Sequence, residues 1–380
     1  MDETTLAALN EQLERAAAYD LYDEVGPVDS VADFRERPFL TAAELKADYE
    51  DHPPEGSLYD GAAMMCFTPL GDDLAPVFDT AADLEWQAEA NAAVLEAAGI
   101  APGDRVLNTF GYHTFGTGVI FQRGLEALGA EVVPAGPGDS ESAAATVAEY
   151  DVDAIVGNPS FALKLGDAGA SVDVFVGAGE PFTSVPGLRE DVKAALDAET
   201  AVDYFGTRQI LPVAAETAAE DGLRVADDYA LAEVIDPDTG EVLPYGERGE
   251  LVVTHLRKEG CPLVRYRTGD LTEWEERDGE VVLPDGVIGR TDGRLKVKGV
   301  KLYPESLGTV LAGFEGPTGD YRIEVSRPES TDHLQLVVEG QADIDVDALA
   351  AAVEDRLLVA PDEVDVVDDV AETGVVDERY

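Results

Sequence analysis

The feature that most limits the fold is an alternation of short apolar runs with helix-like stretches between residues 104 and 204. Helix-like stretches such as Gly116–Leu128 and Gly187–Leu196 separate the apolar runs. The runs have the length of buried strands and lie at 104–110, 131–134, 153–156, 172–176 and 200–204. Because parallel strands need a long crossover, which is usually a helix, the alternation predicts a mostly parallel sheet with helices on its faces.

The rest of the chain follows two other patterns. After about residue 220, turn signals such as Asp236–Gly240 separate strand-like runs, which predicts a β-rich subdomain over about 220–290. From residue 291 onward we expect a small α+β domain with ferredoxin-like layering. Its helices are expected at 304–312 and 346–357, and its strands at 321–325, 334–338 and 363–367. The predicted class is α/β, with a large domain over 1–290 and a small C-terminal domain over 291–380.

Charge excludes several classes of partner. The 380 residues include 79 acidic and 26 basic side chains, a net charge of −53, and the acids are scattered along the chain. Such a surface repels itself at low ionic strength and is screened at molar salt, which predicts a halophilic protein. Nucleic acid and anionic membranes are poor partners for it. No apolar run approaches the roughly 20 residues of a membrane helix, and the start lacks a signal-peptide pattern, so a cytoplasmic protein is expected.

Cysteine and histidine are too few to build a site. Cys66 and Cys261 are far apart in the sequence and suggest neither a disulfide framework nor a thiolate metal site. The histidines show no ligand spacing either; they are His52, His113, His255 and His333. We expect no protein-held metal, and a reaction here must use carboxylates, backbone dipoles and the scarce cations.

The cations are unevenly placed. Ten of the 26 lie within residues 257–301, where even spacing would put about three. They are Arg257, Lys258, Arg265, Arg267, Arg277, Arg290, Arg294, Lys296, Lys298 and Lys301. In so acidic a chain this concentration suggests an anionic ligand, with phosphates favoured because guanidinium forks and ammonium groups suit them. The alternative is a set of salt bridges to the surplus carboxylates.

Two motifs in this region resemble a known family. The segments 249–254 and 262–271 resemble the ribose-binding segment of adenylate-forming enzymes, especially the phenylacetate-CoA ligase branch, and 288–299 resembles the hinge motif of the same family. The resemblance implies that Asp270 holds the ribose hydroxyls of AMP and that Arg290 contacts the nucleotide. It also implies that Asp292 is the pivot about which the C-terminal domain rotates between half-reactions.

The resemblance extends upstream and covers nearly the whole chain. Residues 177–181 look like the loop that packs along adenine, which makes Gly179, Glu180 and Pro181 candidate nucleotide contacts. Phe205 and Gly206 occupy the aromatic-glycine position before the catalytic pair, where the ring can stack on adenine. Residues 110–118 and 158–160 resemble the acyl-pocket side. The implied ligands are ATP or AMP, CoA and a small carboxylic acid, with an aryl acid favoured, and a homodimer is compatible with the family.

Three places depart from the family pattern. Residues 66–76, where a phosphate loop is expected, contain one glycine, two prolines and two carboxylates. After Gly206 the chain reads Thr207-Arg208-Gln209, so the position that would bring Mg²⁺ to ATP carries an amide, a weaker ligand than a carboxylate. No lysine follows Lys301, although the family usually places a catalytic lysine near the C-terminus.

The candidate catalytic residues are therefore Arg208, Gln209 and Lys298. Arg208 is a new cation beside the phosphate site that could replace part of the missing metal or lysine, or it could simply pair with a carboxylate. Two hypotheses follow for the protein. It is an acid–CoA ligase that forms an acyl-adenylate and then a thioester, or it is a nucleotide- or acyl-CoA-binding homologue that has lost adenylation.

Overall fold

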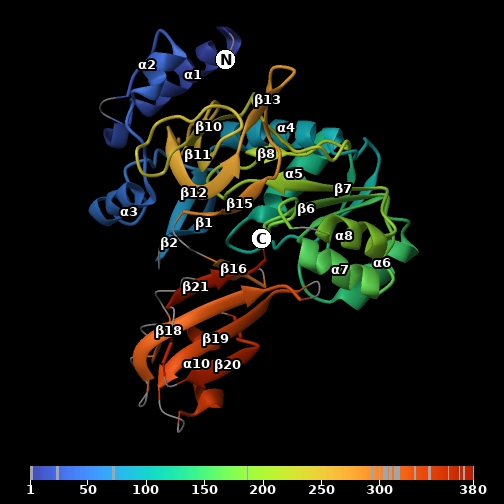
Figure 1. Cartoon of the computed structure of the whole chain (residues 1–380). Helices are drawn as coiled ribbons and strands as arrows, with labels where there is room; N and C mark the ends of the chain where they lie inside the picture. Colours follow the sequence, from blue (N-terminus) through green and yellow to red (C-terminus); the bar gives the residue numbers. More distant parts are fainter. Residues whose placement is uncertain are drawn as a thin grey trace.

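The computed structural model describes all residues except 1–2, 23–24, 71–72, 186, 292–294, 299, 303–306, 308–309, 312–316, 329–330, 341–343, 358, 368, 371–372 and 380. A large N-terminal part is built around one long sheet, and a smaller C-terminal part with its own sheet lies beside it (Figure 1). The mixed α/β class predicted from the sequence is confirmed.

Five neighbouring parallel strands form one end of the long sheet, with β4 (Glu131–Pro134) at its edge. Their spatial order is β4, β3 (Arg105–Asn108), β5 (Ala154–Gly157), β6 (Val174–Ala178) and β7 (Thr200–Phe205). All five strands expected from the apolar runs are present at nearly the predicted bounds. Every residue of β5 is buried, as expected for a strand covered on both faces.

Helices cover both faces because side chains alternate along each strand. Val106, Val156 and Val202 pack in one cluster with Phe121 and its neighbours, under α4 (Ala81–Ala97) and α5 (Thr117–Leu128). The adjacent residues Leu107, Ile155 and Phe175 pack in a second cluster on the other face, under α6 (Ser140–Glu149), α7 (Pro159–Asp167) and α8 (Leu188–Leu196). Figure 1 shows α7 and α8 together on one side of the sheet.

The strands between residues 214 and 290 belong to two sheets. Four extend the long sheet beyond β7 in antiparallel fashion: β8 (Ala214–Ala215), β9 (Leu223–Val225), β14 (Glu280–Leu283) and β13 (Glu275–Arg277). The other four form a separate antiparallel sheet in the order β10 (Ala230–Ile235), β11 (Arg248–His255), β12 (Tyr266–Glu273) and β15 (Val287–Arg290). In this second sheet, β11 and β12 carry most of the segments that resemble the ribose-binding motif, and β15 carries the start of the hinge motif.

The N-terminal region docks on this second sheet through Arg265. Its helices are α1 (Glu3–Ala16), η1 (Asp20–Tyr22), α2 (Val31–Arg35) and α3 (Ala42–Asp51), and they precede a hairpin of β1 (Met64–Leu70) and β2 (Asp73–Asp79). The buried guanidinium of Arg265 donates to the carbonyl oxygens of Arg35 at 2.6 Å and Arg37 at 2.5 Å. It also pairs with Glu233 and lies 4.0 Å from the ring centroid of Phe39.

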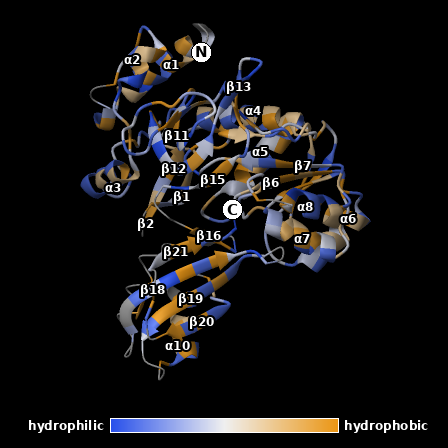
Figure 2. Cartoon of the chain, viewed as in Figure 1, coloured by the Kyte–Doolittle hydropathy of each residue, from blue (hydrophilic) through white to orange (hydrophobic). Residues whose placement is uncertain are grey.

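The C-terminal part is a hairpin followed by an α+β layer. The hairpin pairs β16 (Leu295–Val297) with β17 (Val300–Leu302). The layer has the strand order β20 (Glu363–Val367), β19 (His333–Gly340), β18 (Pro317–Ser326) and β21 (Gly374–Asp377), with α10 (Val346–Leu357) packed on it. Blue and orange residues alternate along β18 in Figure 2, as expected for a strand with one buried face. Most of the helix expected at 304–312 lies outside the described residues.

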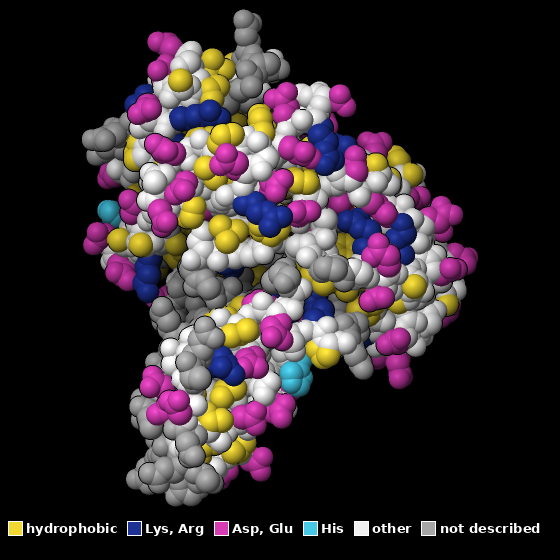
Figure 3. Space-filling view, viewed as in Figure 1, with side chains coloured by type: hydrophobic (Ala, Val, Ile, Leu, Met, Phe, Trp, Pro, Cys, Tyr) yellow, Lys and Arg dark blue, Asp and Glu magenta, His cyan; other side chains and the backbone are white. Residues whose placement is uncertain are grey.

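Acidic side chains are scattered over the face of the molecule shown in Figure 3, among hydrophobic and other atoms, and lysine and arginine appear there in fewer places. In the part of the chain that the structure describes, no helix is both long enough and apolar enough to span a membrane.

Candidate functional site

The candidate site lies at the carboxyl ends of the parallel strands. The segments after β5, β6 and β7 carry Ser160, Glu180 and Arg208, and carboxyl ends of parallel strands meet at one edge of a sheet. The loops after β5 and β6 are joined directly, since the Asn158 side-chain amide donates to the Ala178 carbonyl oxygen at 3.0 Å. Open α/β sheets bind ligands at this edge.

Asp270 and Arg290 form one part of the site. They are paired across β12 and β15, and the Arg290 Nη1 donates to Asp270 Oδ1. The Arg290 Nη2 donates to the Thr268 carbonyl oxygen at 3.0 Å, which holds the guanidinium in place. The Asp270 side chain is 8% exposed and that of Arg290 is 24% exposed. The pair presents an oriented carboxylate beside a partly accessible cation, and the contacts of Asp270 with ribose and of Arg290 with the nucleotide stay predictions.

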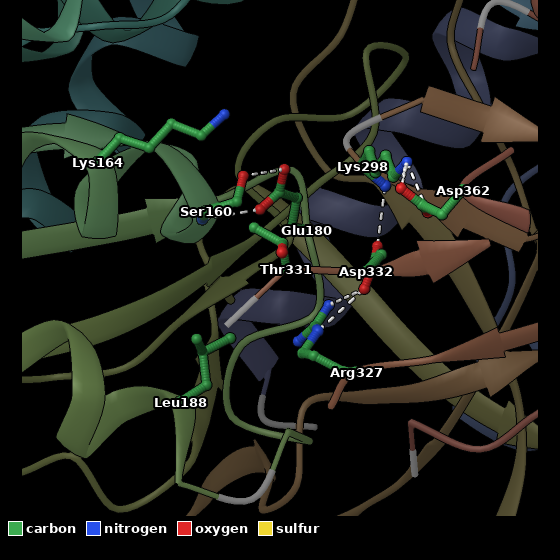
Figure 4. Close-up of a pocket in the computed structure, with 9 residues that line it drawn as sticks. All are labelled: Ser160, Lys164, Glu180, Leu188, Lys298, Arg327, Thr331, Asp332 and Asp362. Carbon is green, nitrogen blue, oxygen red and sulfur yellow. Dashed lines mark hydrogen bonds and ion pairs between the residues drawn. The ribbon is translucent and has the colours of Figure 1, made fainter. Parts of the chain in front are cut away.

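Glu180 and Lys298 belong to a second part, a cavity of about 270 Å³ between the N-terminal and C-terminal parts (Figure 4). The Glu180 carboxylate accepts from the Ser160 amide at 3.0 Å and from its hydroxyl at 2.8 Å. Gly179 has φ +81°, a left-handed conformation that favours glycine there. The cavity is lined by Ser160, Lys164, Glu180, Leu188, Lys298, Arg327, Thr331, Asp332 and Asp362.

The cations of this cavity differ in how they are held. The Lys298 Nζ contacts Asp362 at 2.7 Å and donates to the Ala360 carbonyl oxygen at 3.1 Å. Asp332 accepts from the Lys298 amide at 2.9 Å and from Arg327 at 2.7 Å. Lys164 has no ion-pair partner among the described residues. Lys298 is thus an oriented cation on the C-terminal side of the cavity, opposite the loop of Glu180.

Arg208 belongs to a third part, a buried network of charges. Its side chain is 6% exposed, and its Nη2 donates to Asp79 Oδ2 at 2.5 Å. Lys258 Nζ contacts the other oxygen of Asp79 at 2.5 Å and Asp83 at 3.3 Å, and these three side chains are at most 1% exposed. Burial alone would raise the pKa of Asp79, but the two cations outweigh it and the pKa is lowered. The expectation that Arg208 pairs with a carboxylate is confirmed.

The phosphate-loop region is a closely paired hairpin. Strands β1 and β2 pair along all seven residues of each, from Met64 opposite Asp79 to Leu70 opposite Asp73. Only two residues, 71 and 72, separate the strands in the sequence, and both lie outside the described residues. Much of the stretch where a glycine-rich loop would surround a polyphosphate is strand in this chain.

Gln209 and most of the remaining candidates lie in the loops that follow β6 and β7. Phe205 ends β7, and Gly206, Arg208 and Gln209 follow it in a partly buried turn in which the Thr207 amide donates to the Ile210 carbonyl oxygen. A Cβ on Gly206 would lie 2.4 Å from the end of the Leu211 side chain and 3.0 Å from the Ile210 carbonyl oxygen, so a larger residue would force Leu211 to move. Pro181 is half-buried beside Glu180. The hinge candidate Asp292 lies outside the described residues.

The concentration of cations at 257–301 is not one ligand patch. Lys258 and Arg265 are buried in ion pairs, and Arg267 pairs with Glu250 on the neighbouring strand. Arg277 pairs with carboxylates on its own hairpin and its neighbour. A buried cation is stable only when a carboxylate pairs with it. The surplus acids therefore account for the positions of most cations in residues 257–301.

Sequence reasoning missed the acids of the buried network. Asp79 and Asp83 looked like two of many scattered carboxylates, and Lys258 appeared only as one of ten cations. Their spacing in the chain carries no signal, because residues 79 and 258 meet only through the tertiary fold. A contact between Arg208 and residue 79 is equally invisible in the sequence.

A buried carboxylate on β7 makes the stability of the protein depend on pH. Burial, and to a lesser extent the charge of Glu216, raise the pKa of Asp203 to about 7. The folded state then binds a proton that the unfolded chain has already lost, so stability falls as the pH rises from about 4 through 7. Between pH 5 and 8, Asp203→Asn should gain roughly 2 to 3 kcal/mol of unfolding free energy relative to wild type. Urea unfolding of both proteins at several pH values measures this, and a difference that does not change with pH would contradict it.

Comparison with known proteins agrees with this architecture. Residues 299–367 match the family described as AMP-binding enzyme C-terminal domain. The whole chain superposes on a crystal structure of 2-hydroxyisobutyryl-CoA ligase with 2-HIB-AMP and CoA in the thioesterification state, at a TM-score of 0.85 and 25% identity, covering 90% of that chain. The same ligase in the postadenylation state with 2-HIB-AMP gives a TM-score of 0.74. The chain therefore belongs to the adenylate-forming superfamily.

Within this superfamily the chain is similar to phenylacetate-coenzyme A ligases. It is 34% identical to that of Escherichia coli (strain K12) over 271 residues and 35% identical to that of Thermus thermophilus over 273 residues. Each alignment covers 68% of this chain and 61% of the relative, so the chain matches less than two thirds of the length of these relatives.

Proposed function

We propose that the protein is an acid–CoA ligase of the phenylacetate-CoA ligase type. In the first half-reaction a carboxylate oxygen attacks the α-phosphorus of ATP, and the bond to the β-phosphate breaks to release pyrophosphate. In the second, the CoA thiol loses its proton to water and attacks the carbonyl carbon, which releases AMP. An aryl acid is the favoured substrate by similarity to the phenylacetate-CoA ligases.

The observation that carries the proposal is the relative position of the two parts of the chain. It agrees better with the thioesterification state of 2-hydroxyisobutyryl-CoA ligase than with its postadenylation state, with TM-scores of 0.85 and 0.74. In this arrangement Lys298 and Arg327 from the C-terminal part share a cavity with Lys164. Asp362 and Asp332 already pair with Lys298 and Arg327, so Lys164 is the lining cation without an ion-pair partner among the described residues, and it suits an anionic cosubstrate such as CoA.

A second candidate function is favoured by the residues around Arg208. Gln209 replaces the expected acid, and the phosphate-loop region is a tight hairpin. A protein with these changes could retain the thioester half-reaction, or only ligand binding, without adenylation. The adenosine candidates Asp270 and Arg290 are present in either case, so nucleotide binding alone does not separate the two functions.

Mg²⁺ does not fit the described residues as a protein-held ion. No group of three or more His, Cys, Asp or Glu side chains suited to a metal occurs in the described part of the chain. The position expected to carry the ligand is the amide of Gln209, and magnesium favours carboxylate oxygens. Any Mg²⁺ that takes part in the reaction would therefore enter the site bound to the ATP phosphates.

The test is thioester formation from two starting points. The protein is supplied first with ATP, an aryl acid and CoA in molar KCl, and then with a preformed acyl-adenylate and CoA. Thioester from both supports the ligase, and thioester from the acyl-adenylate alone supports the second candidate. The absence of thioester in both reactions, across aryl and fatty acids, would contradict any CoA-ligase role.

Nucleotide binding should depend on Asp270. Asp270→Asn keeps the shape of the side chain but removes the charge that accepts from ribose hydroxyls, and it should weaken AMP binding by roughly 1 to 3 kcal/mol. Isothermal titration with AMP in molar KCl measures the change. Asp236→Asn on an exposed turn is the matched control and should bind AMP as wild type does. Equal affinity of Asp270→Asn and wild type would contradict the assignment.

We further propose a cytoplasmic protein adapted to high salt, with homodimerisation as a prediction for light scattering. Support for the salt adaptation comes from the net charge of −53 and its spread over the surface in Figure 3. The melting temperature should rise from low salt to molar KCl as repulsion between carboxylates is screened. A melting temperature that stays constant over this range would contradict the adaptation.

A further inference from the structure

The carboxylate of Asp332 joins three other segments of the C-terminal part. Its Oδ1 accepts from Arg327 Nε at 2.9 Å and from Arg327 Nη2 at 2.7 Å. Its Oδ2 accepts from the Lys298 amide at 2.9 Å and from Arg379 Nη1 at 3.1 Å. The Asp332 side chain is 7% exposed. One nearly buried carboxylate therefore connects the end of β18, the turn between β16 and β17, and the segment after β21.

Lys298 lies in the turn of the β16–β17 hairpin, in a conformation that needs support. Val297 and Val300 are the last pair of this hairpin, and Lys298 follows Val297 with φ +50°. Residues other than glycine rarely adopt such left-handed angles, and they do so where the surroundings hold them. Two anchors hold Lys298: its amide donates to Asp332 Oδ2, and its ammonium group contacts Asp362 at 2.7 Å (Figure 4). The position of this lysine on the cavity wall depends on both anchors.

Arg379 supplies the second donor on Oδ2 from a buried position. Its side chain is 2% exposed, and the described residues that line the cavity do not include it. Its Nε and Nη2 donate to the two oxygens of Asp377 at 2.8 and 2.6 Å. The Glu378 amide donates to the Val325 carbonyl oxygen at 2.8 Å, which ties the same segment to β18. Arg379 therefore reaches the cavity through Asp332 rather than by direct contact.

The pair of Arg327 and Asp332 leaves one carboxylate oxygen for other donors. Two nitrogens of a guanidinium frequently bind the two oxygens of a carboxylate, one each. Here both nitrogens of Arg327 donate to Oδ1, and Oδ2 accepts from the Lys298 amide and from Arg379. Without Arg379 the carboxylate is free to rotate until Arg327 takes both oxygens, which draws Oδ2 away from the Lys298 amide. Arg379 thus keeps one oxygen of Asp332 on the Lys298 turn.

We propose that Arg379 is a positioning residue, which fixes the Lys298 turn on the C-terminal wall of the interdomain cavity by holding Asp332 Oδ2. The inference rests on the proposed function for the ligand of this cavity, which is CoA. Lys298 and Asp332 both line the cavity. A displaced turn would move the ammonium group and the carboxylate together and would weaken the binding of an anionic ligand there.

Substitutions of the two arginines that share Asp332 test the proposal. Arg379→Gln removes the donor that shares Oδ2 with the Lys298 amide. Arg327→Gln is the matched control, because it also removes a guanidinium from Asp332 but only from Oδ1. Arg379→Lys keeps the charge without the fork to Asp377 and should lie between Arg379→Gln and wild type. If Arg379→Gln does not fold, Arg379→Lys and Arg327→Gln still decide the question.

The first measurement is hydrogen exchange of single amides in the full chain, in molar KCl and without a ligand. The Lys298 amide should exchange about fivefold or more faster in Arg379→Gln than in wild type, and by an intermediate factor in Arg379→Lys. In Arg327→Gln its exchange should stay within about twofold of wild type, because both donors on Oδ2 remain. The Leu334 amide, which donates to Asp362 at 2.8 Å, is the internal reference and should not change. A general loss of stability would instead accelerate both amides.

The second measurement is isothermal titration of the full chain with CoA and with AMP in molar KCl. Arg379→Gln should weaken CoA binding about fivefold or more, as for a displaced contact. Its affinity for AMP should equal that of wild type, because the candidate contacts Asp270 and Arg290 lie on β12 and β15. Arg322→Gln removes a different ion pair of β18, the one with Glu324, and should bind CoA and AMP as wild type does.

Three outcomes would overturn the inference. The first is exchange of the Lys298 amide that neither Arg379→Gln nor Arg379→Lys accelerates. The second is equal acceleration by Arg327→Gln, which would show a general effect of lost charge. The third is faster exchange in Arg379→Gln with unchanged CoA affinity. A wild-type protein that binds no CoA contradicts the proposed ligase function, and the exchange of the Lys298 amide then decides by itself whether Arg379 holds the turn.

Discussion

ATP–pyrophosphate exchange by the wild-type protein should be slow or undetectable, and Gln209→Glu should accelerate it. By the family resemblance, the altered places would serve pyrophosphate departure: the β1–β2 hairpin, Gln209, and residues 302–380, which contain no lysine. Losing one preorganised charge contact typically removes about 3 to 4 kcal/mol of transition-state stabilisation. Restoring a carboxylate at 209 should therefore raise the exchange rate about tenfold or more.

The exchange assay is run in molar KCl with an aryl acid, and Gln209→Asn serves as the uncharged control. Thioester formation from a supplied acyl-adenylate shows that each variant is folded and competent in the second half-reaction. Robust exchange by wild type would show that Arg208 or another cation has taken over the role of the missing groups. The second candidate function, a homologue without adenylation, would then be abandoned.

Replacing Lys258 should destabilise the protein more than any other single change considered. Its ammonium group is 1% exposed and neutralises Asp79 and Asp83, which are buried to the same degree. Lys258→Met keeps most of the apolar stem but leaves two carboxylates with only Arg208 nearby. Removing one partner of a buried ion pair typically costs roughly 3 to 5 kcal/mol.

Guanidinium unfolding in molar KCl measures this loss. Lys193→Met is the matched control, because Lys193 pairs with Glu220 near the surface and its side chain is 30% exposed; the expected loss is about 1 kcal/mol or less. Combining Lys258→Met with Asp83→Asn should recover part of the stability by removing one uncompensated charge. A loss for Lys258→Met no larger than that of the control would contradict the buried network.

Local patterns predicted the secondary structure well where the pattern alone is decisive. The apolar runs of β3 to β7 cannot be exposed, and their regular spacing leaves room only for crossover helices, so the parallel sheet followed directly. Helix α10 and strand β20 lie at their predicted bounds. The strand β21 was not expected, because Gly374–Asp377 is too short to stand out until it pairs with β18.

Part of the candidate site could also be predicted from local sequence patterns. Asp270 and Arg290 lie in motifs that keep their local spacing, and β12 and β15 then bring the two side chains together. Glu180 follows β6 directly, and its position at the sheet edge is a consequence of strand order.

The sequence by itself determined the α/β class, the acidic surface and the segments that carry the candidate nucleotide contacts, because each of these is written in local spacing or in composition. Only the tertiary structure decided what the cations do. It buried Lys258 and Arg265 in ion pairs, placed Lys298 across a cavity from Glu180, and set Arg208 between Asp79 and the start of α5. The physical reason is that a charge acts through its burial and its nearest partners, and residues that are close in space, such as 79, 208 and 258, are far apart in the chain.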